Sequence, residues 1–397
     1  MKLIKMTKQG AFDMKHNFNG ERLKKARLYN GYTPTELSRE IGCSSRTINM
    51  YENGQIKTPD SSMIESLSKV LDFPTEYFFE PIIFKVQDSS TYFRSLLTVT
   101  KKYRDEQHQK IEIIATVYDL IREYIDFPVF IPPEVTPEDT PEDAAYKLRV
   151  MWNLDNKPIE NINFIVEDNG IITTTFQMST DKIDAFSKKL NDIYLIGYSS
   201  NKTSAARIHF DVAHELGHIC LHGWNEDIES LRENKTDFKN REEEANAFAA
   251  AFLLPKQTFY PDVKQDPRNI EYYIKLKKKW GVSIAAMIRR AYSFNLLSPD
   301  DYQWMMRSLQ KRGIRKEEPL DDTMRTVDPT LLKTAMEMLL EDDVFTPKEF
   351  IDELSYSRRL TIYPHTIESL LNLPEGMLAV PIEPPKHKLR LLKSNTN

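Results

Sequence analysis

The sequence predicts a mainly α-helical protein with one small β-sheet, an α+β chain whose first part is entirely helical. Apolar residues recur at helical spacing over most of the chain, as in the stretch from Ile111 to Ile121. Between residues 162 and 196 the pattern changes to short apolar runs, separated by Gly170 and by Asn and Asp residues that favour turns. We therefore expect a few strands in an otherwise helical fold.

Composition limits the classes of protein to be considered. A chain of 397 residues is long enough for two or three domains, and 40% hydrophobic residues can form sizeable cores. The net charge of −5 argues against a protein that coats nucleic acid, but leaves room for one local DNA-binding module. With only Cys43 and Cys220, no disulfide framework exists, as is typical of a reducing compartment.

Apolar stretches are too short for membrane insertion. The N-terminus has no apolar core of signal-peptide length, and the longest apolar run, residues 247–254, is far shorter than a membrane span. We expect a cytoplasmic protein that has no membrane partner.

Helical patterns, prolines and turns divide the chain into five segments. We expect a flexible arm (1–17), a bundle of short helices (18–80), a helical linker region (81–139), a second domain (140–315), and a helical C-terminal extension with a disordered tail (316–397).

Further elements follow from periodicity and from residues that favour helix starts, such as Thr140-Pro141. Helices are expected over residues 102–124, 140–152, 241–254, 269–280 and 283–294, and strands over 164–166, 171–176 and 194–196. A further helix starts at Ala205. The chain to about residue 371 is expected to be mostly helical, and residues 374–397 poorly ordered.

The N-terminal segment carries a helix-turn-helix pattern. Thr33-Pro34-Thr35-Glu36 is a capping box with proline at the first helical position. Gly42 ends that helix, and Ser44 or Ser45 can cap a second helix that runs to Glu52. Two short helices joined by a tight turn form the arrangement that many DNA-binding proteins use.

Residues 18–79 resemble the XRE/Cro family, notably in Leu23-Lys24-Lys25-Ala26-Arg27 and Tyr51-Glu52-Asn53-Gly54. The resemblance implies five helices, with the third in the major groove of a DNA operator. It implies that Ile48 is core and that the following residues face base edges or phosphates: Ser44, Ser45, Arg46, Thr47 and Asn49. Arg46 suits guanine or phosphate, and Asn49 suits adenine.

Two alternatives stay open for this segment. The small bundle could mediate protein contacts instead of binding DNA. The basic side chains of Lys24, Lys25, Arg27 and Lys57 could contact phosphates or could simply be solvated.

The pentapeptide His214-Glu215-Leu216-Gly217-His218 predicts a metal site. Histidines four residues apart lie on one face of a helix, where both imidazoles can reach one Zn²⁺ ion. Glu215 then lies beside the metal-bound water and can act as the catalytic base in peptide hydrolysis.

A third ligand is expected from the segment that begins at Glu242. A catalytic zinc needs three protein ligands and one open position, and Glu242 supplies a carboxylate. Asn246 lies one turn further on and can accept a hydrogen bond from a ligand histidine. Glu244 points to another side of the same helix and is the second choice as ligand.

The motif of residues 207–222, followed by Glu242-x-Glu244-Ala245-Asn246-x-Phe248-Ala249-Ala250, resembles the ImmA/IrrE family of metallopeptidases. The resemblance implies a zincin-like domain and a site-specific zinc metalloendopeptidase of the HExxH, gluzincin-like type. It implies that His214, His218 and Glu242 bind Zn²⁺ and that Glu215 is the general base. Such proteins typically cleave a repressor and thereby switch on prophage, mobile-element or stress genes.

Several alternatives remain at this stage. The chain could be a non-catalytic repressor or antitoxin whose zinc domain senses a signal or holds a partner. His222 could imitate a ligand or pack beneath the site. Residues 184–187 and 194–196 could form an edge for a substrate strand or an ordinary hairpin. Trp280-Gly281-Val282-Ser283 suggests a second helix-turn-helix, but core packing is the preferred interpretation. The cleaved protein, the operator and a homodimeric state are left open.

Overall fold

The computed structural model describes residues 17–83, 101–176, 185–201, 204–222, 235–315 and 317–379. The expected flexible arm therefore lies outside the described residues, apart from Asn17, as do residues 84–100 of the expected linker region. Within the described residues, no helix combines the length and apolar character needed to cross a membrane.

The N-terminal bundle has the five helical elements that the sequence predicts. They are α1 (Gly20–Tyr29), α2 (Pro34–Glu40), α3 (Ser45–Glu52), α4 (Ser61–Leu71) and the 3₁₀ helix η1 (Thr75–Phe79). The capping box at Thr33 and Glu36 is present, and Ser44 caps α3 by accepting a hydrogen bond from the Thr47 amide. Ile48 is fully buried, as expected for a core residue.

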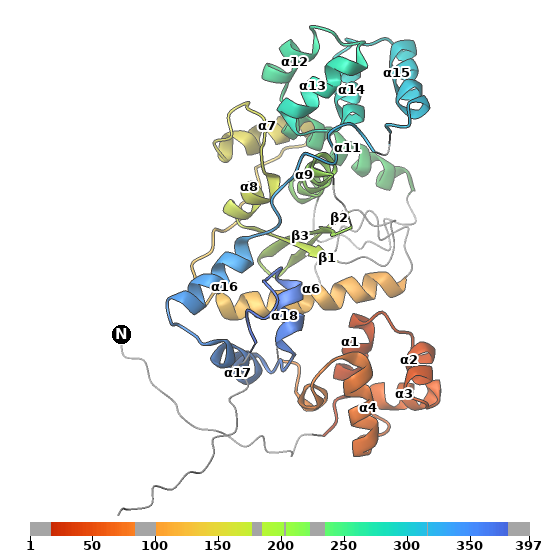
Figure 1. Ribbon diagram of the computed structural model, residues 1–397, viewed down its shortest axis with the longest axis vertical. Helices are drawn as coiled ribbons and strands as arrows, with labels where there is room; N and C mark the ends of the chain where they lie inside the picture. The colour runs from red at the N-terminus through yellow and green to blue at the C-terminus, as the bar shows by residue number, and fades with distance from the viewer. Residues whose placement is uncertain are drawn as a thin grey trace, which may run out of the picture.

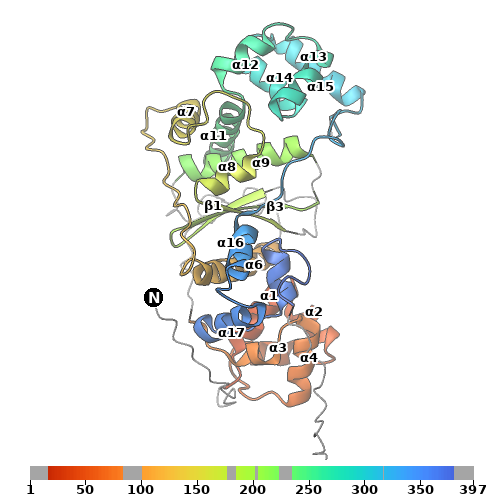
Figure 2. The same cartoon turned by 60° about the vertical axis from the view of Figure 1, so that its left-hand side comes forward.

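The rest of the chain builds three layers around one sheet (Figures 1 and 2). The sheet has β1 (Ile171–Phe176), β2 (Ala185–Leu190) and β3 (Ile193–Ser199). One face is covered by α8 (Ile162–Asp168) and α9 (Ala205–Leu221), with α7 (Pro141–Met151) and α11 (Lys235–Leu253) behind them. The other face is covered by α6 (Lys101–Ile121), α16 (Leu331–Glu341) and α18 (Pro364–Leu370).

The strand order is β1-β3-β2, with β1 parallel and β2 antiparallel to β3. A tight turn joins β2 to β3, so these two strands form a hairpin. Residues 194–196 lie in the central strand, not at an edge. Side chains of β3 alternate between the two cores, with Tyr194 and Ile196 on the α9 side and Leu195 on the α6 side.

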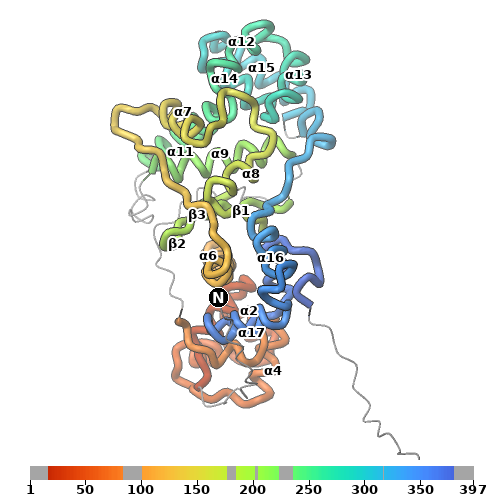
Figure 3. Tube along the Cα trace, turned by 90° about the vertical axis from the view of Figure 1, so that its left-hand side faces the viewer, coloured from red at the N-terminus to blue at the C-terminus, as the bar shows by residue number. Residues whose placement is uncertain are grey.

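Four more helices form a cluster beyond α11, and one helix follows α16. They are α12 (Lys256–Val263), α13 (Ile270–Trp280), α14 (Ile284–Ser293), α15 (Pro299–Lys311) and α17 (Pro347–Arg358). Trp280, Ile284, Met287 and Ile288 are buried in one core, which confirms the packing interpretation of that segment. Figure 3 follows the chain from α15 back past β1 to α16 and α17, beside the N-terminal bundle.

The strand expected over residues 164–166 is wrong, because this segment belongs to α8. Asn161 caps the helix by accepting hydrogen bonds from the amides of Asn163 and Phe164. Ile162 and Val166 are four residues apart and both fully buried, which is helical and not strand periodicity.

Poor order over residues 374–397 is also wrong for the part that is described, residues 374–379. Leu378 is fully buried, and its amide donates a hydrogen bond to Glu368 at 2.7 Å. Residues 380–397 lie outside the described residues.

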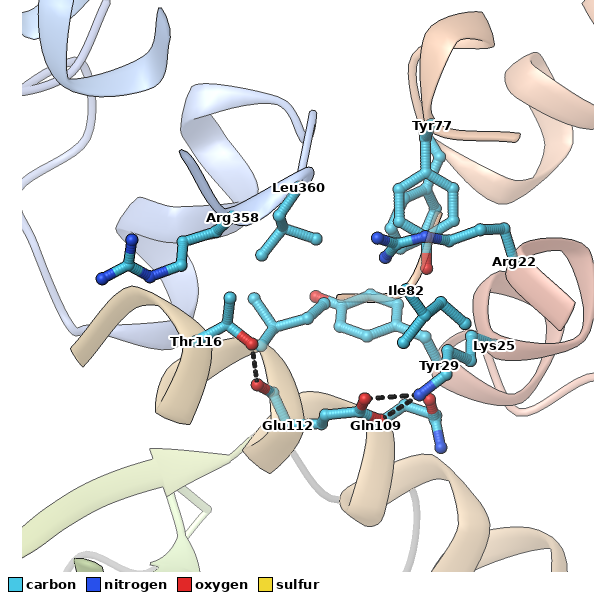
Figure 4. A pocket seen from close by; sticks show the side chains of 12 residues that line it. Arg22, Lys25, Tyr29, Tyr77, Ile82, Gln109, Glu112, Thr116, Arg358 and Leu360 are labelled. Carbon is cyan, nitrogen blue, oxygen red and sulfur yellow. Dashed lines mark hydrogen bonds and ion pairs between the residues drawn. The ribbon is translucent and has the colours of Figure 1, made fainter. Parts of the chain in front are cut away.

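The N-terminal bundle docks on α6 and on the segment that follows α17 (Figure 4). Lys25 of α1 pairs with Glu112 of α6, and Lys102 of α6 pairs with Glu36 of α2 at 2.8 Å. Arg22 of α1 donates to the carbonyl of Arg359, and the Glu80 carboxylate accepts from the Thr361 amide at 2.9 Å. Helix α6 lies in the expected linker region, and it packs against both the sheet and the bundle.

Gly197 provides a test of the packing beneath the sheet. A Cβ at this position would meet the ring of Phe186 and lie 2.6 Å from the Phe176 ring, and these two rings are stacked with centroids 5.4 Å apart. We predict that Gly197→Ala lowers the free energy of unfolding by about 1–3 kcal/mol. Chemical denaturation measures this change.

The matched control is the double variant Gly197→Ala/Phe186→Leu, which removes the obstructing ring edge. It should be more stable than the sum of the two single changes predicts, because the two sites are in contact. Strict additivity, or an unchanged stability of Gly197→Ala, would contradict this account of the core.

Candidate metal centre and nucleic-acid interface

Helices α9 and α11 pack closely, and Gly217 permits their approach. A Cβ on Gly217 would lie 3.2 Å from both the Cα and the carbonyl oxygen of Ala245, and 3.1 Å from the Phe248 ring. Both contact residues belong to α11 and are fully buried. The missing side chain at Gly217 therefore sets how near the two helices lie.

This packing brings His214, His218 and Glu242 together. The Nε2 atoms of His214 and His218 are 3.0 Å apart. Glu242 places Oε1 3.4 Å from His218 Nε2 and Oε2 3.8 Å from His214 Nε2. All three side chains are buried, and one donor atom of each lies within 4.8 Å of the others.

The donor set fits a zinc ion. Zinc bonds of roughly 2.0–2.2 Å to nitrogen and oxygen, at tetrahedral angles, separate neighbouring donors by about 3.3–3.4 Å. The separations in this cluster, 3.0 to 3.8 Å, bracket that value. Two imidazoles and one carboxylate leave a fourth position for water or substrate, as in catalytic zinc sites.

The carboxylate of Glu215 lies at the boundary between α9 and the sheet. It is 2% exposed, and Ser187 of β2 donates a hydrogen bond to its Oε2 at 2.7 Å. Ser187 is itself fully buried, so the bond is shielded from water. The sequence alone gave Ser187 no role, because nothing marks which face of a short strand will meet a helix.

His222 supports His218 from behind. The two Nδ1 atoms lie 3.0 Å apart, and His222 Nε2 lies 3.0 Å from Glu244 Oε2. A His218 that ligates through Nε2 carries its proton on Nδ1 and donates it to His222, which in turn donates to Glu244. Burial lowers the pKa of His222 to about 2, with a smaller effect from His218, so His222 is neutral.

This arrangement corrects the expectation for Asn246. Its amide donates to the backbone carbonyl of Glu242 at 2.7 Å and does not contact a ligand histidine. His222 makes the supporting contact instead. The sequence signal for it was present, since His222 repeats the four-residue spacing of His214 and His218. Glu244, the second choice as ligand, lies at the outer end of this chain of contacts.

His209 on the same helix belongs to the core. Its Nε2 lies 3.3 Å from Thr326 Oγ1, and burial lowers its pKa to about 4. It therefore stays neutral at ordinary pH and packs beside Gly281.

In the bundle, α3 lies on the side away from α6 (Figures 1 and 2). Arg46 and Asn49 are exposed, and Ser44 is exposed although its hydroxyl caps the helix. Ser45 and Thr47 are half-buried. The donor-rich side of α3 is therefore accessible to a duplex.

Two of the basic residues that were left open have internal partners. Arg27 is buried and forms a two-pronged ion pair with Glu52 of α3, at 2.5 and 2.8 Å. Lys25 pairs with Glu112. Lys24 and Lys57 are exposed. Only the latter two of these four side chains are placed where a phosphate could reach them.

Comparison with known families matches both parts of the chain. A helix-turn-helix domain family matches residues 20–80, and the peptidase M78 family, described as the IrrE N-terminal-like domain, matches residues 166–292. No curated protein gives a significant match. The chain thus has the ImmA/IrrE architecture, with an XRE-like helix-turn-helix domain followed by a metallopeptidase-like domain, and the fold class is α+β as predicted.

His222 generates a prediction about metal affinity. His222→Ala removes the hydrogen-bond partner of His218 Nδ1, and we predict a roughly 10- to 100-fold weaker zinc affinity with the fold retained. Competition with a chromogenic chelator measures the affinity, and circular dichroism checks the fold. Glu244→Ala, at the outer end of the same contacts, is the matched control and should lose less. Equal affinity of His222→Ala and wild type would contradict the supporting role.

The exposed side of α3 generates a second prediction. Arg46→Ala and Asn49→Ala should each weaken specific operator binding by about 1–3 kcal/mol per lost bidentate base contact. Fluorescence anisotropy with selected duplexes measures this at fixed salt concentration. Lys24→Ala is the control for a phosphate contact and should weaken all duplexes similarly. Unchanged specific binding in both α3 variants would show that α3 does not read DNA.

Proposed function

We propose that this protein is a DNA-binding transcriptional regulator whose second domain is a zinc-dependent site-specific endopeptidase. Its substrate would be a repressor protein in a prophage, mobile-element or stress response. The observation that carries the proposal is the buried carboxylate of Glu215, adjacent to the ligand His214 and oriented by Ser187. A zinc site with a purely structural role has no need of a base at this position.

The three proposed ligands, His214, His218 and Glu242, would hold the zinc ion. When bound, zinc supplies a polarised carbonyl and a water of lowered pKa. Glu215 accepts the proton of that water and passes it to the leaving amine, which is general base and then general acid catalysis. Ser187 keeps the carboxylate on the metal side of α9, and His222 fixes the ring of His218.

Strand β2 supports a mode of substrate binding. It pairs with β3 along one side and is the outer strand of the described sheet. Ser187, the residue that contacts Glu215, lies in the middle of this strand. An extended substrate segment that pairs with β2 would pass beside the proposed base and metal ligands, in the way that many proteins bind peptides by strand addition.

The helix-turn-helix domain would place the peptidase near its substrate. It would bind an operator through α3, or dock beside a repressor that is already bound to DNA. Either arrangement raises the effective concentration of a substrate that shares the DNA, and so accounts for a site-specific peptidase with a DNA-binding module.

The competing proposal is a non-catalytic regulator, a repressor or an antitoxin, in which the zinc domain senses a signal or binds a partner. The same ligands and the same α3 would serve both roles. The two proposals differ in whether Glu215 is needed.

Glu215→Gln is the decisive variant, because it keeps size and polarity but removes the base. We predict that it retains zinc and loses about 10²- to 10⁴-fold of peptide-bond cleavage. Terminal-peptide proteomics in the native host, with and without DNA damage, compares wild type with Glu215→Gln. Glu134→Gln, which changes an exposed carboxylate, is the control. A new protein terminus formed in wild type and in the control, but not in Glu215→Gln, would name the substrate. Identical termini in all three, with an unchanged regulatory effect, would favour the non-catalytic proposal.

A further inference from the structure

A hollow lies between α9, α11 and α14, which neighbour one another at one end of the molecule (Figure 1). It has an empty volume of about 540 Å³ and opens to solvent. Its walls include Phe210 from α9, Asn246, Ala247 and Ala250 from α11, and Ala286 from α14. The hollow is therefore built largely by the two helices that carry the proposed zinc ligands.

The hollow begins one helical turn from the metal ligands on both helices. Phe210 precedes His214 by four residues, and Asn246 follows Glu242 by four residues. One turn of α-helix rises 5.4 Å, which is comparable to the distance between a scissile peptide bond and the side chains that flank it. Asn246 also donates to the carbonyl of Glu242, so this wall is fixed to the backbone of a ligand residue.

The walls are apolar and the charges lie at the rim. The ring of Phe210 and the methyl groups of three alanines form most of the interior. Arg290 is buried and is engaged by Glu142 at 2.7 Å and by the carbonyl of Leu254, so its charge is already satisfied. Arg289 and Glu243 are exposed. Such a space selects an apolar group and excludes a charged one, because a buried charge would lack a partner.

We propose that this hollow is the subsite for an apolar, leucine-sized side chain of the cleaved polypeptide, next to the scissile bond. The assignment rests on the proposed peptidase function and adds to it a determinant of substrate choice. Alanine at positions 247, 250 and 286 leaves the space that the substrate side chain fills. Phe210 forms the wall nearest His214.

The test uses binding, so that it does not depend on turnover. The probes are short peptides with a hydroxamate group that chelates zinc, identical except for one flanking side chain: glycine, alanine, leucine or lysine. Calorimetry with the full-length, zinc-loaded protein measures their affinities, and the zinc content of the same sample is determined. The leucine probe should bind at least about tenfold more tightly than the glycine probe, and the lysine probe should gain nothing.

Two variants fill the hollow. Ala250→Phe places a ring inside it, and Ala247→Leu narrows its exposed side if the first variant is unstable. Either should abolish the preference for leucine while the glycine probe binds as before. Lys239→Phe is the matched control, since it adds the same ring to an exposed position of α11 outside the hollow. It should retain the preference.

The outcomes separate the subsite from the peptidase function. A leucine preference that both filling variants abolish supports the subsite. Equal binding of the leucine and glycine probes by wild type, or a preference unchanged in both variants, overturns it. A leucine preference in a protein that cleaves no peptide under any condition would leave the subsite standing and reject the endopeptidase function.

Discussion

The close packing of α9 against α11 is the constraint on which the proposed site depends. Neither helix holds a complete set of ligands, because α9 supplies two imidazoles and α11 supplies the carboxylate. Gly217 lets the backbone of Ala245 approach to a distance that a side chain would obstruct. The separations between donor atoms, and hence the fit to a zinc ion, follow from that approach. The hollow proposed for an apolar side chain lies between the same pair of helices.

The sheet then orients what the helices bring together. Strand β2 presents Ser187 to Glu215 on one face and Lys188 to His108 of α6 on the other. Helix α6 also pairs with the helix-turn-helix domain through Lys25 and Glu36. One helix thus contacts both the DNA-binding bundle and the strand that holds the proposed base. The bundle and the metal centre are connected by packed elements and not only by the chain between them.

Local signals in the sequence were sufficient for much of this structure. Capping boxes at Thr33 and Thr140 marked helix starts that the structure confirms. The apolar stripe of α6 was identified by spacing alone. The His214-to-His218 spacing and the later Glu242 predicted a cluster whose members do lie together. Each of these inferences depends on residues within one or two turns of each other, or on a motif that specifies both partners.

Other features depend on contacts that sequence periodicity does not encode. Residues 164–166 are β-branched and aromatic in the main, yet the cap at Asn161 and the burial of Ile162 and Val166 made them helical. Asn246 and His222 were both near the site by spacing, but the rotation of α11 about its axis determined which of them meets His218. Ser187 reached Glu215 only through the pairing and placement of β2.

The most direct test of the central claim, that α9 and α11 together form a zinc site, is X-ray absorption at the zinc edge of the loaded protein. We predict nitrogen and oxygen neighbours at about 2.0–2.2 Å, with the multiple-scattering signature of two imidazoles that becomes one in His214→Ala. A sulfur neighbour at about 2.3 Å, or a spectrum unchanged in His214→Ala, would contradict the claim.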